Sequence, residues 1–302
     1  MLLEPAVAKL LSNALLLIPV LVFARYFYRK EYKRAMVLLS AYLFLSGIVL
    51  LTKFVLKVPR PDDDVSFDPY SFPSFHTAYA SLLFFLVPNV FTFIYAVLMG
   101  ALRVLAGVHT WVDVLGGFLF AGLSLWLYKK GKERVGFEWD RQAFHMGSGA
   151  LLGLLLYLNW KLGLALLAAA LLVGAIIYHE RERTLVKPFL DFFDRDGTGK
   201  GAFLFVLGVF AAAAINHSWA WKATWYLAYV DSTATMVGKY FRTRGKSFYG
   251  TLGGFFVGLL VAIATETPLW LPVVVSIVEL LPYIDDNISI PVAVALVGRL
   301  IA

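Results

Sequence analysis

A histidine and an aspartate four residues apart, His109 and Asp113, have a spacing that suits a nucleophilic or basic histidine. At the start of a helix, residues four apart share a face, so the carboxylate can hold one ring N–H and fix the tautomer. A histidine held in this way is a good nucleophile or base. His76 follows Pro73 and Ser74 at the expected start of another helix, where backbone N–H groups favour an anion, and it suits a general acid.

Three cations lie in the same stretch, each near the end of an apolar segment: Lys53, Arg60 and Arg103. They would surround a phosphate, and the two guanidinium groups offer forked donors to its oxygens. By itself, each is more typical of an interfacial anchor, because long basic side chains reach from span ends to the membrane surface. Their order among the two histidines and Asp113 instead predicts one phosphate site at a membrane surface.

Composition predicts an all-α, polytopic membrane protein. The chain has 302 residues, of which 60% are hydrophobic and 16% charged, and a mean hydropathy of +0.74. Apolar runs of about 15–23 residues, the length of a bilayer crossing, predict about 12 transmembrane helices. The net charge of +7 comes from basic loops between spans, so we expect no nucleic-acid partner. The absence of cysteine excludes disulfides and thiolate metal sites. We expect a multi-pass protein, most simply of a prokaryotic plasma membrane.

The expected spans divide into two helical-bundle domains. A domain at 1–130 would hold five spans and a domain at 141–302 seven, with a cytoplasmic linker at 131–140 between them. Basic loops after the first and fifth spans predict that these loops are cytoplasmic, which places the phosphate site of the first domain outside. The expected spans are about 6–24, 35–52, 76–87, 90–107, 111–128, 144–159, 162–178, 201–216, 223–240, 250–264, 268–281 and 288–301.

The N-terminal motifs resemble those of the type 2 phosphatidic acid phosphatases, or lipid phosphate phosphatases. The matching segments are Lys53 to Arg60-Pro61, Pro73-Ser74-Phe75-His76, and Arg103 to His109 to Asp113. The resemblance implies a cofactor-free mechanism in which His109 attacks phosphorus, Asp113 orients it and His76 protonates the leaving oxygen. It also implies phosphate binding by Lys53, Arg60, Ser74 and Arg103.

Three departures from that family affect the expected site. Phe75 stands where the motif has glycine, and Leu102 stands where it has serine before Arg103. Five expected spans also replace the usual six. A bulky Phe75 would narrow the site or favour a lipid chain, and the loss of the serine removes one hydrogen bond to phosphate.

The C-terminal half carries a second set of polar residues, which are predicted to face the cytoplasm. Asp231 lies inside an apolar span, where a carboxylate marks a functional site. Acidic residues at the end of a later span would bind Mg²⁺, and basic, hydroxyl and glycine residues would bind the phosphates of a nucleotide. The expected metal ligands are Asp231, Glu279, Asp285 and Asp286. The expected nucleotide ligands are Arg141, His145, Asp196, Gly197, Lys200, Lys239, Lys246, Ser247, Gly250 and Thr251.

This second set resembles the polyprenol kinases, which include dolichol and phytol kinases. The segment from Glu279 to Asn287 carries the most specific likeness, whereas Tyr249 departs from a glutamate of the motif. The resemblance implies CTP as phosphoryl donor, Mg²⁺, an isoprenoid alcohol as acceptor and Asp231 as a catalytic residue.

The sequence therefore predicts a bifunctional enzyme of isoprenoid lipids. A phosphatase on the outer face and a kinase on the inner face would both supply polyprenyl monophosphate. Two alternatives remain. The second half could be a CTP:lipid-phosphate cytidylyltransferase, or the whole chain could be a lipid-phosphate transporter with degenerate motifs.

Overall fold

The computed structural model describes residues 4–61, 69–180, 199–243, 245–281 and 284–301, with residues 174–180 described by backbone alone. These residues are almost entirely helical and contain no strand, which confirms the all-α expectation. The chain divides into two compact units, Met1–Lys130 and Gly131–Ala302. The predicted nucleotide ligands Asp196 and Gly197 lie outside the described residues.

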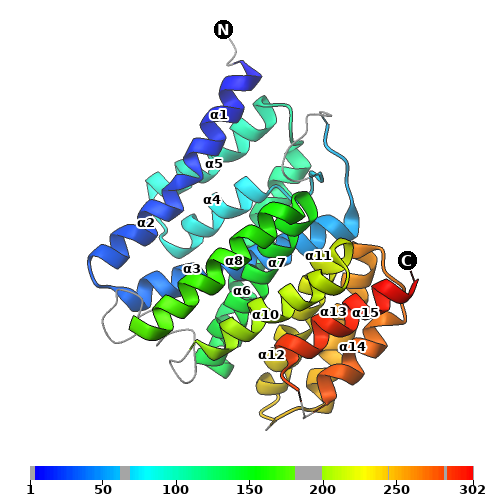
Figure 1. The fold of residues 1–302 in the computed structure, drawn as a ribbon. Helices are drawn as coiled ribbons and strands as arrows, with labels where there is room; N and C mark the ends of the chain where they lie inside the picture. Colours follow the sequence, from blue (N-terminus) through cyan, green and yellow to red (C-terminus); the bar gives the residue numbers. More distant parts are fainter. Residues whose placement is uncertain (1–3, 62–68, 181–198, 244, 282–283, 302) are drawn as a thin grey trace. The chain divides into compact units, whose positions relative to one another are not determined.

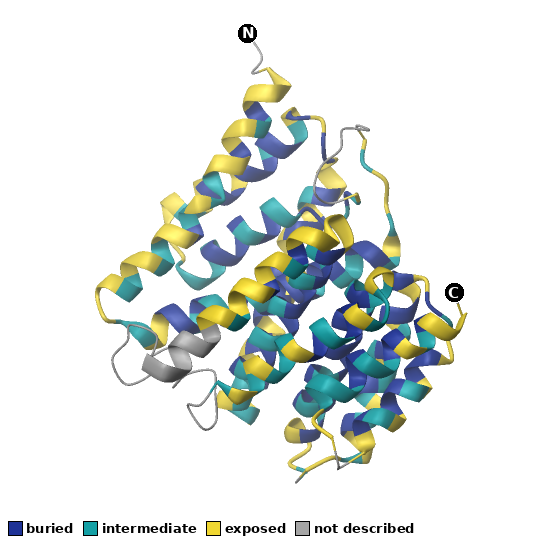
Figure 2. Cartoon of the chain, in the orientation of Figure 1, coloured by how far each residue is buried: buried dark blue, intermediate teal, exposed yellow. Residues whose placement is uncertain are grey.

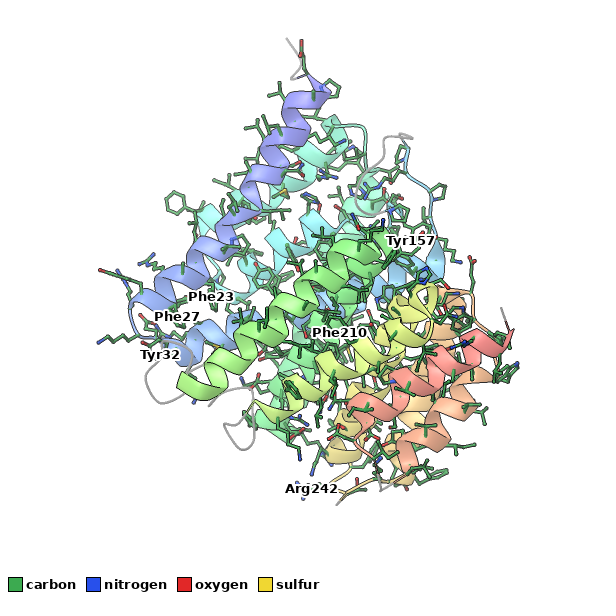
Figure 3. The ribbon with its side chains drawn as sticks, in the orientation of Figure 1. Phe23, Phe27, Tyr32, Tyr157, Phe210 and Arg242 are labelled. Carbon is green, nitrogen blue, oxygen red and sulfur yellow. The ribbon has the colours of Figure 1, made fainter. Side chains whose placement is uncertain are left out.

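The first unit contains five complete helices and most of a sixth (Figure 1). Helix α1 packs on α5, α2 on α3, and α4 on α5. At the turn between α2 and α3, Phe23 stacks on Phe27, whose ring meets the edge of Tyr32 (Figure 3). The helices are α1 (Pro5–Leu15), α2 (Leu17–Tyr28), α3 (Tyr32–Leu56), α4 (Phe75–Leu86), α5 (Val90–Leu105) and α6 (Trp111–Val135).

Polar caps define the start of the two helices that follow the longest loop of this unit. Ser74 is the N-cap of α4 and accepts a hydrogen bond from the Thr77 N–H. Asn89 caps α5 in a reciprocal capping box with Thr92. Such caps satisfy N–H groups that have no partner inside the helix. The cap at Ser74 fixes the helix end that carries His76.

The second unit has a longer series of helices around a core of its own. Leu156, Leu167 and Val209 belong to one buried apolar cluster, and the Trp225 indole donates to the Ala150 carbonyl at 3.0 Å. Between α11 and α12 lies one π-helical turn that ends at Asp231. The elements are α7 (Phe137–Leu158), α8 (Trp160–Glu180), α10 (Lys200–Ile215), η1 (His217–Trp219), α11 (Ala220–Tyr226), η2 (Leu227–Asp231), α12 (Ser232–Tyr240), α13 (Phe248–Thr265), α14 (Leu271–Leu280) and α15 (Asp286–Ile301).

Four segments of the described chain are long and apolar enough to cross a membrane: Pro5–Tyr28, Tyr32–Leu56, Trp111–Val135 and Phe248–Thr265. Other apolar helices are shorter. Phe75–Leu86, for example, has 12 residues, about 18 Å of helix against a hydrocarbon core of about 30 Å. The expectation of about 12 transmembrane helices is therefore not confirmed. Exposed apolar side chains lie along both α1 and α2 (Figure 2), which fits an integral membrane protein.

The residues expected to form a linker, 131–140, are almost wholly helical. Helix α6 continues to Val135, and α7 begins at Phe137 after a single residue with positive φ, Gly136. Lys132 and Asp140 form an ion pair at 2.8 Å across this turn. In the structure this polar segment is the end of α6, a turn at Gly136 and the start of α7.

Candidate active site

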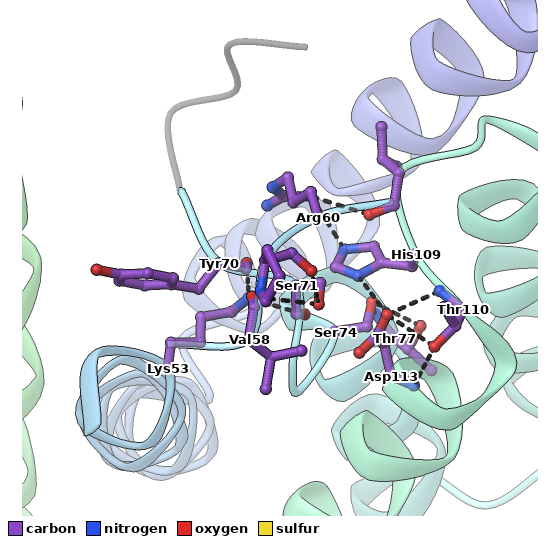
Figure 4. Close-up of polar contacts among 12 residues, drawn as sticks. Lys53, Val58, Arg60, Tyr70, Ser71, Ser74, Thr77, His109, Thr110 and Asp113 are labelled. Atoms are coloured by element: carbon purple, nitrogen blue, oxygen red, sulfur yellow. Dashed lines mark hydrogen bonds and ion pairs between the residues drawn. The ribbon is translucent and has the colours of Figure 1, made fainter. Parts of the chain in front are cut away.

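His109 lies in the short connection between α5 and α6 and is only 3% exposed (Figure 4). Its Nδ1 faces Oδ2 of Asp113 at 3.6 Å, and its Nε2 lies 3.4 Å from Nη1 of Arg60. A guanidinium can only donate, so Nε2 is the acceptor of this contact and the ring proton resides on Nδ1. The structure thus brings together the predicted nucleophile, its orienting carboxylate and one predicted phosphate ligand.

Asp113 is itself held in place by Thr110. The carboxylate oxygen that faces His109 accepts from the Thr110 N–H at 2.7 Å and from the Thr110 hydroxyl at 3.0 Å. The lone pair of His109 Nε2 is therefore directed away from the carboxylate and toward Arg60. A phosphoryl group bound by that guanidinium would lie within reach of Nε2, and Nε2 would exchange its contact with Arg60 for a bond to phosphorus. Thr110 was not among the predicted site residues, although its position directly after His109 is a readable signal.

The environment of His109 keeps its imidazole neutral. Burial, which has the largest effect, and the positive charges of Lys53, Arg60 and Arg103 together lower the pKa of His109 from 6.5 to about 4. The nearby carboxylate of Asp113 acts in the opposite direction and raises this pKa. A neutral ring is the nucleophilic form of histidine, so at neutral pH the nucleophile needs no prior deprotonation.

Lys53 connects the first motif to the second. Its ammonium is completely buried and donates to the backbone carbonyls of Tyr70 at 2.6 Å and Ser71 at 3.0 Å. Ser71 in turn donates its N–H to the Val58 carbonyl at 2.9 Å. The lysine therefore fixes the loop that precedes Ser74, while its charge contributes to the field around His109.

Ser74 lies directly against the start of α6. Its backbone N–H donates to the Asp113 carbonyl at 2.9 Å, and its buried hydroxyl accepts from the Thr77 hydroxyl at 3.0 Å. A hydroxyl that accepts can still donate its own hydrogen. Ser74 is therefore compatible with its predicted phosphate-binding role as well as serving as a helix cap.

Gly117 permits this close approach of α6 to the second motif. A Cβ at Gly117 would lie 2.6 Å from the Ser74 carbonyl oxygen, whereas one at Gly122 in the same helix would meet only the Phe85 ring at 3.6 Å. We expect Gly117→Ala to lower the free energy of unfolding by about 1–3 kcal/mol, because a backbone atom must move.

The same displacement is expected to reduce phosphate release at least tenfold. Gly122→Ala is the matched control and is expected to keep full activity, because alanine there meets ordinary contacts and favours the helix by about 0.5–1 kcal/mol. Thermal unfolding in detergent and a phosphate-release assay would check both variants. Equal behaviour of the two variants would contradict a tight approach at Gly117.

His76 and Arg103 both contact helix α1, which no sequence motif identified. His76 Nε2 lies 3.0 Å from Oδ1 of Asn13, and Arg103 Nη1 donates to the Ser12 hydroxyl at 3.1 Å. Arg103 is buried in α5, and His76 is half-buried at the start of α4. Ser12 and Asn13 have no distinctive spacing relative to the motifs, so only the fold reveals their place in the site.

The two departures from the phosphatase motifs occupy well-defined positions. Phe75 packs on the Tyr79 ring at 4.4 Å between centroids, and the Tyr79 hydroxyl pairs with that of Ser46. Leu102 is 4% exposed and belongs to an apolar cluster that also includes Ala8 of α1. Phe75 thus stands where the motif has a small glycine, and Leu102 stands where it has a polar serine. Both apolar side chains pack against other residues of the first unit.

In the second unit, a cavity of about 200 Å³ is lined by six of the predicted nucleotide and metal ligands. Lys246 and Asp286 both line the cavity, and the Lys246 ammonium donates to the Asp286 carboxylate at 2.9 Å. The same ammonium also donates to the Leu281 carbonyl at 3.1 Å and to the Glu279 carbonyl. The predicted residues that line the cavity are Lys239, Lys246, Ser247, Gly250, Glu279 and Asp286, and a seventh, Thr251, donates to the Glu279 carboxylate at 3.1 Å.

The other predicted residues of this half that the structure describes lie outside that lining. His145 faces Asp231 at 3.6 Å, Arg141 is paired with Glu138, and Asp285 accepts from the Asn287 amide at 2.9 Å. Lys200 is exposed at the first turn of α10. Within the described residues, no three His, Asp or Glu side chains are grouped so that they could hold a metal ion. A magnesium site at Asp231, Glu279, Asp285 and Asp286 therefore stays a prediction.

Comparison with known proteins bears on the N-terminal part alone. Residues 34–136 match the PAP2 superfamily, and this part of the chain therefore contains a PAP2 superfamily domain. The match begins inside α3, so α1 and α2 lie before it. No curated protein and no solved structure matches the chain.

Proposed function

From the PAP2 superfamily domain, which points to phosphatase activity on lipid phosphates, we propose that the first unit hydrolyses polyprenyl phosphates or diphosphates with His109 as nucleophile. The observation that carries the proposal is the buried neutral imidazole between the Asp113 carboxylate and the Arg60 guanidinium. An isoprenoid substrate follows from the proposed pairing with a polyprenol kinase in the same chain.

The proposed reaction has two steps and uses only side chains and water. His109 Nε2 forms a bond to phosphorus as the bond to the leaving oxygen breaks, and His76 gives that oxygen a proton. Asp113 stabilises the positive ring through Nδ1–H. Water then attacks the phosphohistidine while His76 takes up a proton, and inorganic phosphate leaves. Lys53, Arg60, Ser74 and Arg103 are the proposed ligands of the phosphoryl oxygens.

The low pKa of His109 predicts the acidic limb of the pH profile. Because that pKa is lowered to about 4, the neutral nucleophile is present at higher pH and is lost as the pH falls through about 4. We expect kcat/KM, corrected for the measured phosphate ionisation of the substrate, to decline near pH 4, well below the limb near 6.5 of an ordinary histidine. A corrected limb at 6.5 would contradict the buried, cation-surrounded site.

The phosphatase proposal is tested by phosphate release from polyprenyl diphosphate, polyprenyl monophosphate and phosphatidic acid, with and without EDTA. We expect release from the diphosphate to be fastest and to persist in EDTA. If no substrate yields phosphate, the proposed activity is wrong. Faster release from the monophosphate would instead leave the activity intact but contradict a role in supplying polyprenyl monophosphate.

For the second unit we propose a CTP-dependent polyprenol kinase. The cavity lined by Lys239, Lys246, Ser247 and Gly250 supports this, because cations and helix-starting N–H groups suit nucleotide phosphates. Glu279 and Asp286 border the same cavity, and Mg²⁺ usually takes one or two carboxylates together with substrate phosphates. The bound ion would neutralise charge on the transferred phosphoryl group.

Labelled CTP separates this proposal from its alternatives. A kinase releases CDP and transfers the γ-phosphate to an isoprenoid alcohol, whereas a cytidylyltransferase releases pyrophosphate and makes a CDP-lipid. Either CTP-dependent activity, kinase or cytidylyltransferase, should be lost in EDTA. The Lys246→Met variant should also lack it, while phosphate release by the first unit continues. A transporter would yield neither product and would still translocate lipid phosphate after His109→Ala.

A further inference from the structure

Helix α1 supplies two adjacent polar side chains to the proposed phosphatase site. Asn13 contacts His76, the proposed general acid, and Ser12 contacts Arg103, a proposed phosphate ligand. The two partners belong to different motifs on different helices, α4 and α5. Both contacts come from a helix that precedes the matched PAP2 residues, 34–136.

Helix α1 is anchored against α5 and the loop that carries His109. Ala8 is completely buried in a cluster with Leu102, Ala106 and Val108. At the other end of α1, the Tyr95 hydroxyl donates to the Leu15 carbonyl at 3.0 Å. Ser12 is also completely buried and donates its own hydrogen to the Lys9 carbonyl at 2.9 Å, so its oxygen is oriented to accept from Arg103.

We propose that Asn13 and Ser12 are positioning residues of the phosphatase site, with Asn13 orienting His76 for proton donation and Ser12 orienting Arg103 for phosphate binding. This inference rests on the proposed phosphatase function. It makes α1 a working part of the site, in addition to its place in the membrane.

The chemistry of the Asn13 contact assigns a nitrogen to each task of His76. The Asn13 amide oxygen can only accept, so Nε2 of His76 carries a hydrogen and Nδ1 is the nitrogen left to gain and release a proton. Burial and the positive charges of Arg103, Arg60 and Lys53 lower the pKa of His76, so the ring is neutral in the free site and Nδ1 would gain its proton together with the anionic phosphate of a bound substrate. The proton transferred to the leaving oxygen therefore comes from Nδ1, which breaks its N–H bond as the P–O bond breaks. After transfer, the neutral ring keeps its hydrogen on Nε2 and its bond to Asn13.

Leaving-group dependence tests this role. An alkyl phosphate needs a proton on its leaving oxygen, whereas p-nitrophenyl phosphate releases a stable anion. Because general acids contribute about 10²–10⁴-fold, we expect Asn13→Ala to lower kcat on the alkyl phosphate at least tenfold more than on p-nitrophenyl phosphate. His76→Ala should show the same selective loss, and adding Asn13→Ala to it should cost little more. Asn13→Asp, which retains an acceptor, should restore the alkyl activity.

Ser12→Ala is expected to behave differently, with a raised KM and an equal loss on both substrates, because Arg103 binds the phosphoryl group in either case. Leu10→Ala is the matched control on the same helix, since Leu10 is 70% exposed. It should leave both activities unchanged.

Three outcomes would overturn parts of this account. If wild type hydrolyses neither substrate, the phosphatase function itself fails. If wild type is active and Asn13→Ala loses the same factor on both substrates, Asn13 only supports the fold. If Asn13→Ala raises activity, the amide competes with the substrate and does not assist it.

Discussion

Replacing His109 by glutamine is expected to abolish phosphate release from lipid substrates, with a fall in kcat of about 10⁴-fold or more. The loss of a covalent nucleophile removes the reaction path and not merely one contact, as in other enzymes that form a covalent intermediate. Glutamine approximates the reach of the ring and can still accept from Arg60, so substrate binding should largely remain. Rapid quenching with ³²P-labelled substrate would show labelled protein in wild type and none in the variant.

An exposed histidine of the second unit provides the control. His217 contacts the Trp160 ring and is exposed, so His217→Gln should keep full phosphate release. Label trapped on the His109→Gln protein, or release within tenfold of wild type, would show that another group attacks phosphorus.

Asp113→Asn is expected to reduce kcat by about 10²–10⁴-fold with a much smaller change in KM. The carboxylate faces Nδ1 of His109 at 3.6 Å and is held by two donors from Thr110. An amide has nearly the same shape but cannot stabilise the positive ring, and loss of an orienting aspartate has effects of this size in other histidine-dependent enzymes. Single-turnover formation of the labelled protein should slow by the same factor as kcat.

A second substitution separates electrostatics from geometry. Thr110→Val removes one hydroxyl donor to Asp113 but keeps the backbone N–H bond, so it should cost about tenfold or less. If Asp113→Asn lowers only substrate affinity and leaves kcat intact, Asp113 acts in binding and does not orient the nucleophile.

The motif residues of the first unit were accessible from sequence because their chemistry and local spacing coincide. His109 and Asp113 are four residues apart and lie side by side, and Ser74 caps the helix that carries His76. Basic residues at span ends predicted one cluster, and the charges of Lys53, Arg60 and Arg103 all act on His109. The composition likewise predicted the all-α fold.

Helix length and long-range contacts could not be predicted in the same way. The apolar run 268–281 was predicted as a span but forms a helix of only 10 residues, Leu271–Leu280, because hydropathy reports that residues are apolar and not where a helix begins and ends. Ser12 and Asn13 belong to no recognisable motif. Their proximity to Arg103 and His76 becomes visible only in the fold, in which α1 packs on α5. In the second unit, residues predicted as one site lie partly in the cavity and partly at the His145–Asp231 pair.

The contacts of α1 also determine when the site can form during synthesis. Asn13 is 63 residues from His76, Ser12 is 91 from Arg103, and Arg60 is 49 from His109. Helices form locally and quickly, whereas contacts at such separations require most of the unit to be present. The polar residues of α1 therefore lack their partners until α4, which carries His76, and α5, which carries Arg103, have been made. On the proposed function, the first unit would therefore become catalytically competent only late in its synthesis.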